Sequence, residues 1–161
     1  MFSDEQINRY VDAIIRMISN AENISISFMT ANADLILSHI KEQLWNGEDA
    51  FGNNISPSYL QDPYFNSARE ARNYAVWKDN ITPNPQRDFS SPNLFINGYF
   101  WNSLYIDETG EVNSHYLPEI ITKYGGERTF SLQDKNYPDI EEAWETYFTN
   151  YLQENIISIL S

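Results

Sequence analysis

The clearest pattern in the chain is the recurrence of apolar residues every three or four positions near both ends. From Ile7 to Ile18 this spacing predicts an amphipathic helix. Ser3 and Gln6 have the spacing of a capping box, and Asn20 is the expected end. At the other end, Pro138 opens a second helix with the strongest helical period in the chain. Its apolar stripe comprises Ile140, Ala143, Trp144, Tyr147, Phe148, Tyr151, Leu152 and Ile156.

Two more helices are predicted between these ends, over 32–44 and 67–79. Gly47 follows the first of them as a plausible stop. The segment 24–28 alternates apolar and polar residues, so it is either a short strand or a bent continuation of the first helix. The stretches 45–63 and 82–92 are rich in Gly, Asn and Pro and predict loops. The loop at 82–92 contains three prolines, and we expect it to be extended, exposed and available to a partner.

The centre of the chain, 92–106, is its most apolar and aromatic run. Asn97-Gly98 interrupts this run as a turn, and the alternation that follows predicts a strand over 100–106. A turn at 107–110 and a returning strand at 111–115 complete a β-hairpin. A short helix is expected over 117–125, and 128–132 is a loop or a short strand.

These elements predict an α+β fold in which helices pack on a small, mainly antiparallel sheet around a central hairpin. The length of 161 residues suits one domain. We expect a single domain over 1–161, with N-terminal helices at 4–46, a loop and helix at 47–82, a hairpin core at 93–116 and a C-terminal helix at 138–158.

The net charge of the chain limits the kinds of partner that it can bind. There are 23 acidic and 10 basic residues, for a formal charge of −13, and a field of this sign repels nucleic acid and anionic membranes. Cysteine is absent, and no apolar run approaches the ~20 residues of a membrane span. The N-terminal residues lack a signal-peptide pattern, so a cytosol-like compartment is expected.

No motif in the sequence carries recognisable chemistry. His39 and His115 lie far apart, and 134–139 lacks the spacing of a calcium loop. We therefore expect no catalytic residues, no metal and no cofactor. A carbohydrate-active enzyme, with acids near Trp45, Trp77, Trp101 or Trp144, is a distant alternative. The one basic cluster, Arg69, Arg72, Lys78 and Arg87, is expected to form salt bridges rather than to bind nucleic acid.

Aromatic residues are unusually dense in the predicted loops between 59 and 101. Protein interfaces are enriched in such residues. A core closed by its own loops would explain them equally well, so both interpretations stay open. The interface candidates are Tyr59, Tyr64, Phe65, Phe89, Phe95, Tyr99 and Trp101.

An ordered set of short motifs over 43–132 resembles the virion morphogenesis proteins of tailed phages. These are small neck, head–tail joining and tail-completion proteins, including those of crAss-like phages. The family pattern is a Gly-x-Asp-x-x-Gly turn, a Tyr-x-x-x-Lys helix, a Leu-x-x-Thr-Gly-x-Phe-x-x-Ser segment and a later Tyr-Gly. The matching residues are Gly47, Asp49, Gly52, Tyr74, Lys78, Leu94, Gly98, Phe100, Ser103, Tyr124 and Gly125. Asn97 departs from the pattern, where threonine is usual.

The resemblance implies a non-enzymatic, ring-forming component of a virion at the portal–tail junction. It would assemble in the host cytoplasm as a homo-oligomer, contact portal or tail proteins, and let DNA pass without specific binding or membrane contact. The alternative is an acidic cytosolic binding module, of the immunity or inhibitor type, that docks a basic partner.

Overall fold

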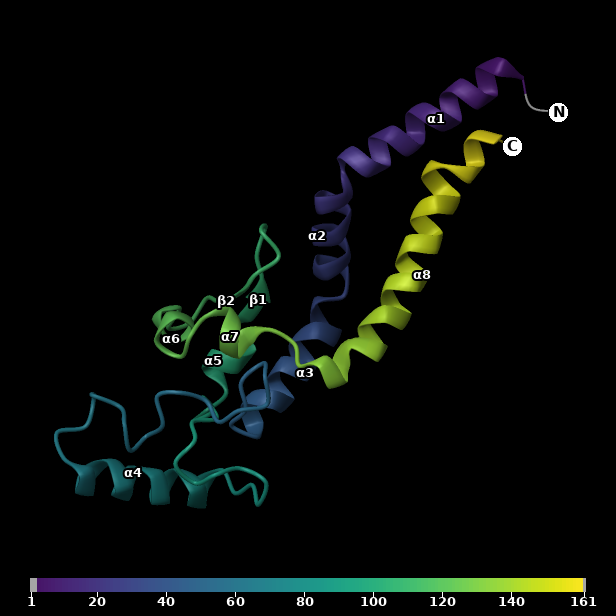
Figure 1. Cartoon of the computed structure of the whole chain (residues 1–161). Helices are drawn as coiled ribbons and strands as arrows, with labels where there is room; N and C mark the ends of the chain where they lie inside the picture. The colour runs from purple at the N-terminus through teal and green to yellow at the C-terminus, as the bar shows by residue number, and fades with distance from the viewer. Residues whose placement is uncertain (1–2, 161) are drawn as a thin grey trace.

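The computed structural model describes residues 3–160, and the fold is α+β (Figure 1). Within these residues, helices surround one two-stranded antiparallel sheet. Residues 1, 2 and 161, which the predicted domain included, lie outside the described part. None of the described helices is long and apolar enough to cross a bilayer.

The N-terminal third is a series of three helices: α1 (Asp4–Ser19), α2 (Ala21–Ala31) and α3 (Ala33–Trp45). The predicted capping box is confirmed, because Ser3 Oγ accepts from the Gln6 backbone N–H at 3.2 Å and Gln6 Oε1 accepts from the Ser3 N–H at 2.9 Å. The open question at 24–28 is resolved as helix. Ile24 and Phe28 are both buried, and their separation of four residues places them on one helical face.

Helix α4 (Ala68–Ile81) confirms the predicted helix at 67–79, and Ser67 caps it by accepting from the Glu70 N–H. The 82–92 segment is a loop, and the expectation that it is exposed is only partly right, because its exposed residues are Pro83, Pro85, Gln86 and Asp88. Arg87 and Ser91 are buried, and the Arg87 guanidinium donates to the carbonyls of Thr82 and Ser91 at 2.9 Å each. These bonds close the loop on itself.

The predicted strand over 100–106 is wrong in its first half. A helical turn, α5 (Tyr99–Asn102), comes first, and only β1 (Leu104–Ile106) is strand. Gly98 begins this turn with φ +81°, and its carbonyl accepts from the Asn102 N–H at 2.8 Å. Phe100 is buried from this turn and Leu104 from β1, so both point into the core.

The hairpin itself is confirmed. Strand β2 (Val112–Ser114) pairs antiparallel with β1, with Tyr105 opposite Asn113. Asp107 Oδ1 accepts from the backbone N–H groups of Thr109 and Glu111, which fixes the turn.

The C-terminal part contains α6 (Glu119–Lys123), α7 (Glu127–Phe130), the 3₁₀ turns η1 (Asp134–Asn136) and η2 (Ile157–Leu160), and the long helix α8 (Tyr137–Asn155). The segment 128–132, predicted as loop or strand, thus begins in a helical turn. Helices α6 and α8 confirm the helices expected at 117–125 and 138–158, with shorter bounds.

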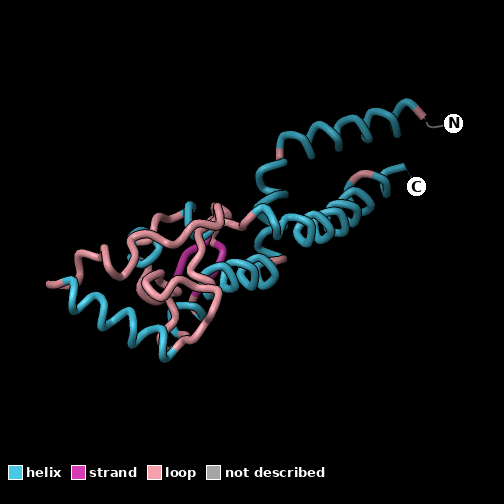
Figure 2. Tube along the Cα trace, turned by 60° about the horizontal axis from the view of Figure 1, so that its bottom comes forward, coloured by secondary structure: helices cyan, strands magenta, loops and turns pink. Residues whose placement is uncertain are grey.

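The main core lies where α3 meets the hairpin and the short helices. It contains Ile36, Leu37, Ile40, Leu44, Ile55, Phe100, Leu104, Tyr124 and Phe130. Helices α1 and α8 extend away from this core, and their far ends lie close together near the two termini (Figures 1 and 2). The molecule is therefore a compact body with a pair of helical arms.

Candidate functional site

The described residues hold no cluster that could perform metal chemistry. Within 3–160, no group of three or more His, Asp or Glu side chains converges on one point. His39 Nε2 lies 3.1 Å from Asp139 Oδ2, where it forms an ion pair when protonated. His115 stacks on Tyr105, with ring centroids 4.0 Å apart. Both histidines have structural contacts in the chain.

A buried polar junction joins α4 to the segment before α5. The Lys78 side chain is 1% exposed, and its Nζ donates to Asn93 Oδ1 at 2.6 Å, to Thr82 Oγ1 at 3.3 Å and to the Phe95 carbonyl. Burial, and to a lesser degree the nearby Arg87 charge, lowers the pKa of Lys78 from 10.5 to about 8. Of the four basic residues expected to form salt bridges, Arg87 pairs with Asp79 at 3.2 Å, Lys78 is held by neutral oxygens, and Arg69 and Arg72 are exposed.

The first motif, at 47–52, forms a tight loop that docks on this junction. Gly47 has φ +68°, and its carbonyl accepts from Ser91 Oγ at 2.6 Å. The buried Asp49 carboxylate accepts from the N–H groups of Phe51 and Asn53, and Arg128 Nε lies 3.2 Å from its other oxygen. The motif residues thus fix a loop to α7 and to the 82–92 segment.

An aromatic hollow of about 520 Å³ lies beside the junction. Asp62 and Lys123, paired at 2.6 Å, stand at one side of it. Its lining gathers many of the residues selected from the sequence: Tyr59, Tyr64, Phe65, Tyr74, Lys78, Leu94, Gly98, Phe100 and Tyr124. Sequence motifs that lie far apart in the chain therefore meet in one place.

Two tyrosines with raised pKa values and two leucines with left-handed backbone also line this hollow. Burial, with Asp62 as the next cause, raises the pKa of Tyr124, and burial also raises the pKa of Tyr59. The two non-glycine residues with left-handed backbone among 3–160 are Leu94 (φ +55°) and Leu117 (φ +53°), and both line the hollow. Such conformations persist only where the surrounding structure enforces them.

The remaining motif residues support the hairpin and the turn after α6. Ser103 Oγ lies 2.6 Å from Ser114 Oγ and also accepts from the Tyr116 N–H. Gly125 has φ +95°, a region that favours glycine. Ser103 and Gly125 therefore shape the local backbone of the hairpin and of this turn.

The interface candidates divide by exposure. Tyr64 and Tyr99 are 77% and 63% exposed, and are free to contact another molecule. Phe95 and Trp101 pack edge-to-face on each other and on Trp45. Phe65 and Phe89 are half-buried, whereas Tyr59 is buried and contacts the ring of Tyr74.

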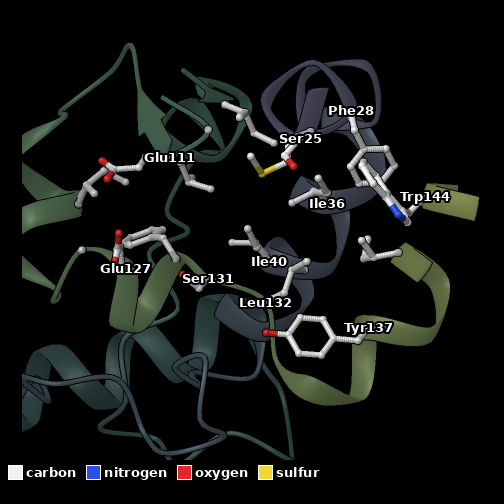
Figure 3. Close-up of a pocket in the computed structure, with 18 residues that line it drawn as sticks. Ser25, Phe28, Ile36, Ile40, Glu111, Glu127, Ser131, Leu132, Tyr137 and Trp144 are labelled. Carbon is white, nitrogen blue, oxygen red and sulfur yellow. The ribbon is translucent and has the colours of Figure 1, made fainter. Parts of the chain in front are cut away.

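A second hollow, of about 470 Å³, lies between the body and the base of α8 (Figure 3). At one end the ring of Phe28 meets that of Trp144 edge-to-face at 5.1 Å. Glu111 and Glu127 lie at the other end, with Ile36 and Ile40 between. Among the described residues that line it, none is basic.

The helical arms carry the two apolar stripes that the sequence predicts. On α1, Ala13 is the one fully buried residue within Asp4–Ser19, and four aliphatic side chains are about half exposed or more. Within Tyr137–Asn155, all of it described, α8 has no fully buried side chain. The strong amphipathic periods of α1 and α8 are visible in the sequence, but such a period does not show whether the apolar face packs in a core or at an interface.

Comparison with known proteins finds no matching family model, curated protein or solved structure.

Proposed function

We propose that this protein is a structural component of a tailed-phage particle, at the junction between portal and tail. In this role it assembles as a ring around the DNA channel, in contact with neighbouring virion proteins. The proposal combines the ordered motifs at 47–125 with the architecture of a compact body and projecting arms.

The observation that carries the proposal is the exposed apolar surface of α1, whose Ile7, Val11, Ile15 and Ile18 are about half exposed or more, together with the partly buried stripe of α8. Soluble monomers rarely keep large contiguous apolar surfaces in water, and such surfaces mark interaction sites. An assembly subunit needs them, because its helices complete their burial against neighbours.

The charge of −13 supports the same role. A channel wall of this sign repels the phosphate backbone, so DNA slides past without being held. The polar junction around Lys78 and Arg87 adds rigidity to the body, as a load-transmitting joint requires.

A mass-spectrometric inventory of purified particles tests the proposal. We expect the protein in stoichiometric amounts in mature virions, and its gene disruption should yield filled heads without tails. Negative-stain images of the purified protein, or of its complex with the portal, should show rings. Absence from particles would refute the proposal.

A second candidate is an acidic binding module for a basic protein. The hollow in Figure 3 favours it, because an apolar floor with Glu111 and Glu127 at one end suits an apolar side chain beside a lysine or arginine. Capture of a basic toxin, abolished by replacing both glutamates with glutamine, would support this candidate over the first.

A further inference from the structure

The chain contains two Asn-Gly dipeptides, Asn46-Gly47 and Asn97-Gly98. In such a pair the backbone nitrogen of the glycine can attack the side-chain amide carbon of the asparagine, because this attack closes a five-membered ring. Glycine favours the attack, since it has no Cβ to hinder the approach and adopts the widest range of backbone angles. The two pairs therefore share one intrinsic chemistry, and the fold decides which of them reacts.

The first pair is held in place at the end of α3. The Gly47 N–H donates to the Leu44 carbonyl at 2.9 Å, so the nitrogen that would attack is already bonded. Asn46 Oδ1 accepts from Asn84 Nδ2 at 2.9 Å, which fixes the side-chain amide. Gly47 is also buried, and its carbonyl accepts from the Ser91 hydroxyl. A reaction here requires these contacts to open first, and such local opening costs free energy.

The second pair lacks these restraints. Asn97 is an exposed residue in the irregular segment before α5. Within residues 3–160, no group accepts a hydrogen bond from the Gly98 N–H or from Asn97 Nδ2. In the part of the chain that the structure describes, the attacking nitrogen and the leaving amine are therefore both free of hydrogen-bond partners.

A backbone donor lies where the reaction develops charge. The Tyr99 N–H donates to Asn97 Oδ1 at 3.1 Å, and this bond folds the side-chain amide back on the residues that follow it. When the ring closes, negative charge develops on that oxygen. A donor that is already in place stabilises this charge.

Water can reach the pair through the aromatic hollow of about 520 Å³. Asn97 and Gly98 both line this hollow, and so does Tyr64, whose ring is 77% exposed. Gly98 has little exposed surface of its own, but it borders this open space. The hollow therefore supplies the water that the second step of the reaction consumes.

We propose that Asn97 is a site of spontaneous covalent modification, in which the Gly98 nitrogen displaces ammonia from the Asn97 side chain. A bond forms between the Gly98 nitrogen and Asn97 Cγ, the bond from Cγ to Nδ2 breaks, and the proton of the Gly98 N–H leaves with the ammonia. One water molecule then opens the succinimide ring at either of its carbonyl carbons. The products are aspartate and isoaspartate at position 97, and no oxidant or reductant takes part. This modification goes beyond the proposed function and needs no partner.

The two products should differ in their effect on the fold. Aspartate keeps an oxygen that can accept from the Tyr99 N–H, so it adds a negative charge at the edge of the hollow and changes little else. Isoaspartate adds one methylene to the main chain directly before Gly98, whose positive φ begins α5. Helix α5 carries the buried Phe100, so the longer backbone should displace this ring from the core.

Site-by-site mass spectrometry of the incubated full chain tests the proposal, with Asn46 as the matched control. At mildly alkaline pH we expect the folded protein to convert Asn97 at least about tenfold faster than Asn46. In guanidinium the two rates should lie within about threefold of each other, because the unfolded chain restrains neither pair. Equal rates in the folded chain, or faster conversion at Asn46 or at another asparagine, would overturn the proposal.

Two substitutions test the causes. Asn84→Ala removes the partner of the Asn46 side chain, so it should raise the Asn46 rate a few-fold and leave the Asn97 rate unchanged. No change at Asn46, in a variant that keeps the wild-type circular dichroism, would overturn the protective contact. Asn97→Gln should stop modification at this position, because ring closure through the longer side chain is slower. Release of ammonia at the wild-type rate from this variant would overturn the proposal.

The stability of each product tests the predicted effect on α5. Asn97→Asp reproduces one product without the added methylene, and its thermal midpoint should match that of the wild type. The isoaspartate form, separated by ion exchange and identified by isoaspartyl methyltransferase labelling, should unfold at a lower temperature. Equal midpoints for all three would overturn the effect on α5. These outcomes are separable from the proposed function: a protein that is absent from particles but modified at Asn97 loses only the phage role, and an unreactive virion protein loses only this site.

Discussion

At the residue scale, the body is organised by buried polar side chains rather than by apolar contacts alone. Lys78 and Arg87 lie side by side in the interior, and each donates to backbone carbonyls of segments that lack regular structure. Loop carbonyls removed from water need such donors. Two buried cations therefore hold irregular segments in place, and burial makes them sensitive to substitution and to pH.

Lys78 gives the stability of the protein a distinctive pH dependence. Its pKa is about 8 in the folded chain and 10.5 when solvated, so between these values the unfolded state binds more protons. The free energy of unfolding should therefore rise from pH 8 to about 9.5. Above pH 10 it should fall, because Tyr59 and Tyr124 have raised pKa values and keep their protons only when folded.

Urea unfolding of the Lys78→Met variant checks this assignment. Methionine fills similar space but leaves the Asn93 and Phe95 oxygens without their donor, so we expect a loss of about 2–4 kcal/mol at pH 7 and no rise between pH 8 and 9.5. The exposed Lys135→Met variant should keep the wild-type profile. A rise that persists in Lys78→Met would assign it to another group.

Two glycines with similar backbone conformations allow the cost of backbone strain to be separated from the cost of a steric clash. The positive φ angles at Gly47 (+68°) and Gly52 (+77°) both favour glycine. A Cβ at Gly47 would lie 2.7 Å from Ser91 Oγ, whereas a Cβ at Gly52 would have none of the described atoms within 4 Å. Gly52→Ala should cost about 1 kcal/mol of unfolding free energy. Gly47→Ala should cost at least about 2 kcal/mol more. Thermal denaturation measures both, and equal losses would contradict the packing argument.

At the scale of elements, burial at helical spacing outweighs an alternating pattern in α2, which has no side-chain cap. The segment at 24–28 alternates, yet it is helical with Ile24 and Phe28 buried four residues apart, whereas in α5 Phe100 is the one buried residue. The hairpin keeps its strands only where Leu104–Ile106 pairs with Val112–Ser114. Helix α8 is attached to α2 through aromatic rings, with Phe28 against both Trp144 and Tyr147.

Removal of one ring should loosen this attachment. Phe28 is 5% exposed, and Phe28→Ala should lower the free energy of unfolding by about 3–5 kcal/mol. Tyr64→Ala, at a ring that is 77% exposed, should change it by less than about 0.5 kcal/mol. Tryptophan fluorescence during urea unfolding reports both. In hydrogen exchange, the Phe28 variant should lose protection first along α8.

At the scale of the whole molecule, charge is the dominant property. Ten basic residues do not balance 23 acids, and Lys78 and Arg87 are buried, so the surface repels itself and other polyanions. Apolar burial within the chain must outweigh this repulsion. Salt reduces it without weakening apolar burial.

Ionic strength should therefore stabilise the protein. We expect the thermal midpoint to rise between about 10 and 150 mM NaCl, and duplex DNA to show no binding by fluorescence anisotropy at the lower salt. A falling midpoint would mean that surface ion pairs outweigh the net repulsion. Retention of DNA would contradict the role of a non-binding channel wall.

The sequence by itself determined the local features of this protein. Ser3 and Gln6 cap α1, Ser67 starts α4, and Asp107 with Gly110 shapes the hairpin turn, because caps and turns are made by residues a few positions apart. The helical periods of α1 and α8 and the α+β class were predictable for the same reason. The acidic charge, a sum over residues, needed no structure either.

The tertiary structure decided which apolar and charged residues are inside. The sequence predicts an apolar stripe on both α1 and α8, but the folded chain leaves the stripe of α1 exposed and buries that of α8 only in part. Lys78 and Arg87 read as surface cations, but the carbonyls they satisfy come from residues up to seventeen positions away. Burial depends on which distant segments meet, and periodicity carries no information about that. Whether an apolar helix face belongs to the core or to an interface is therefore decided only by the arrangement of the whole chain.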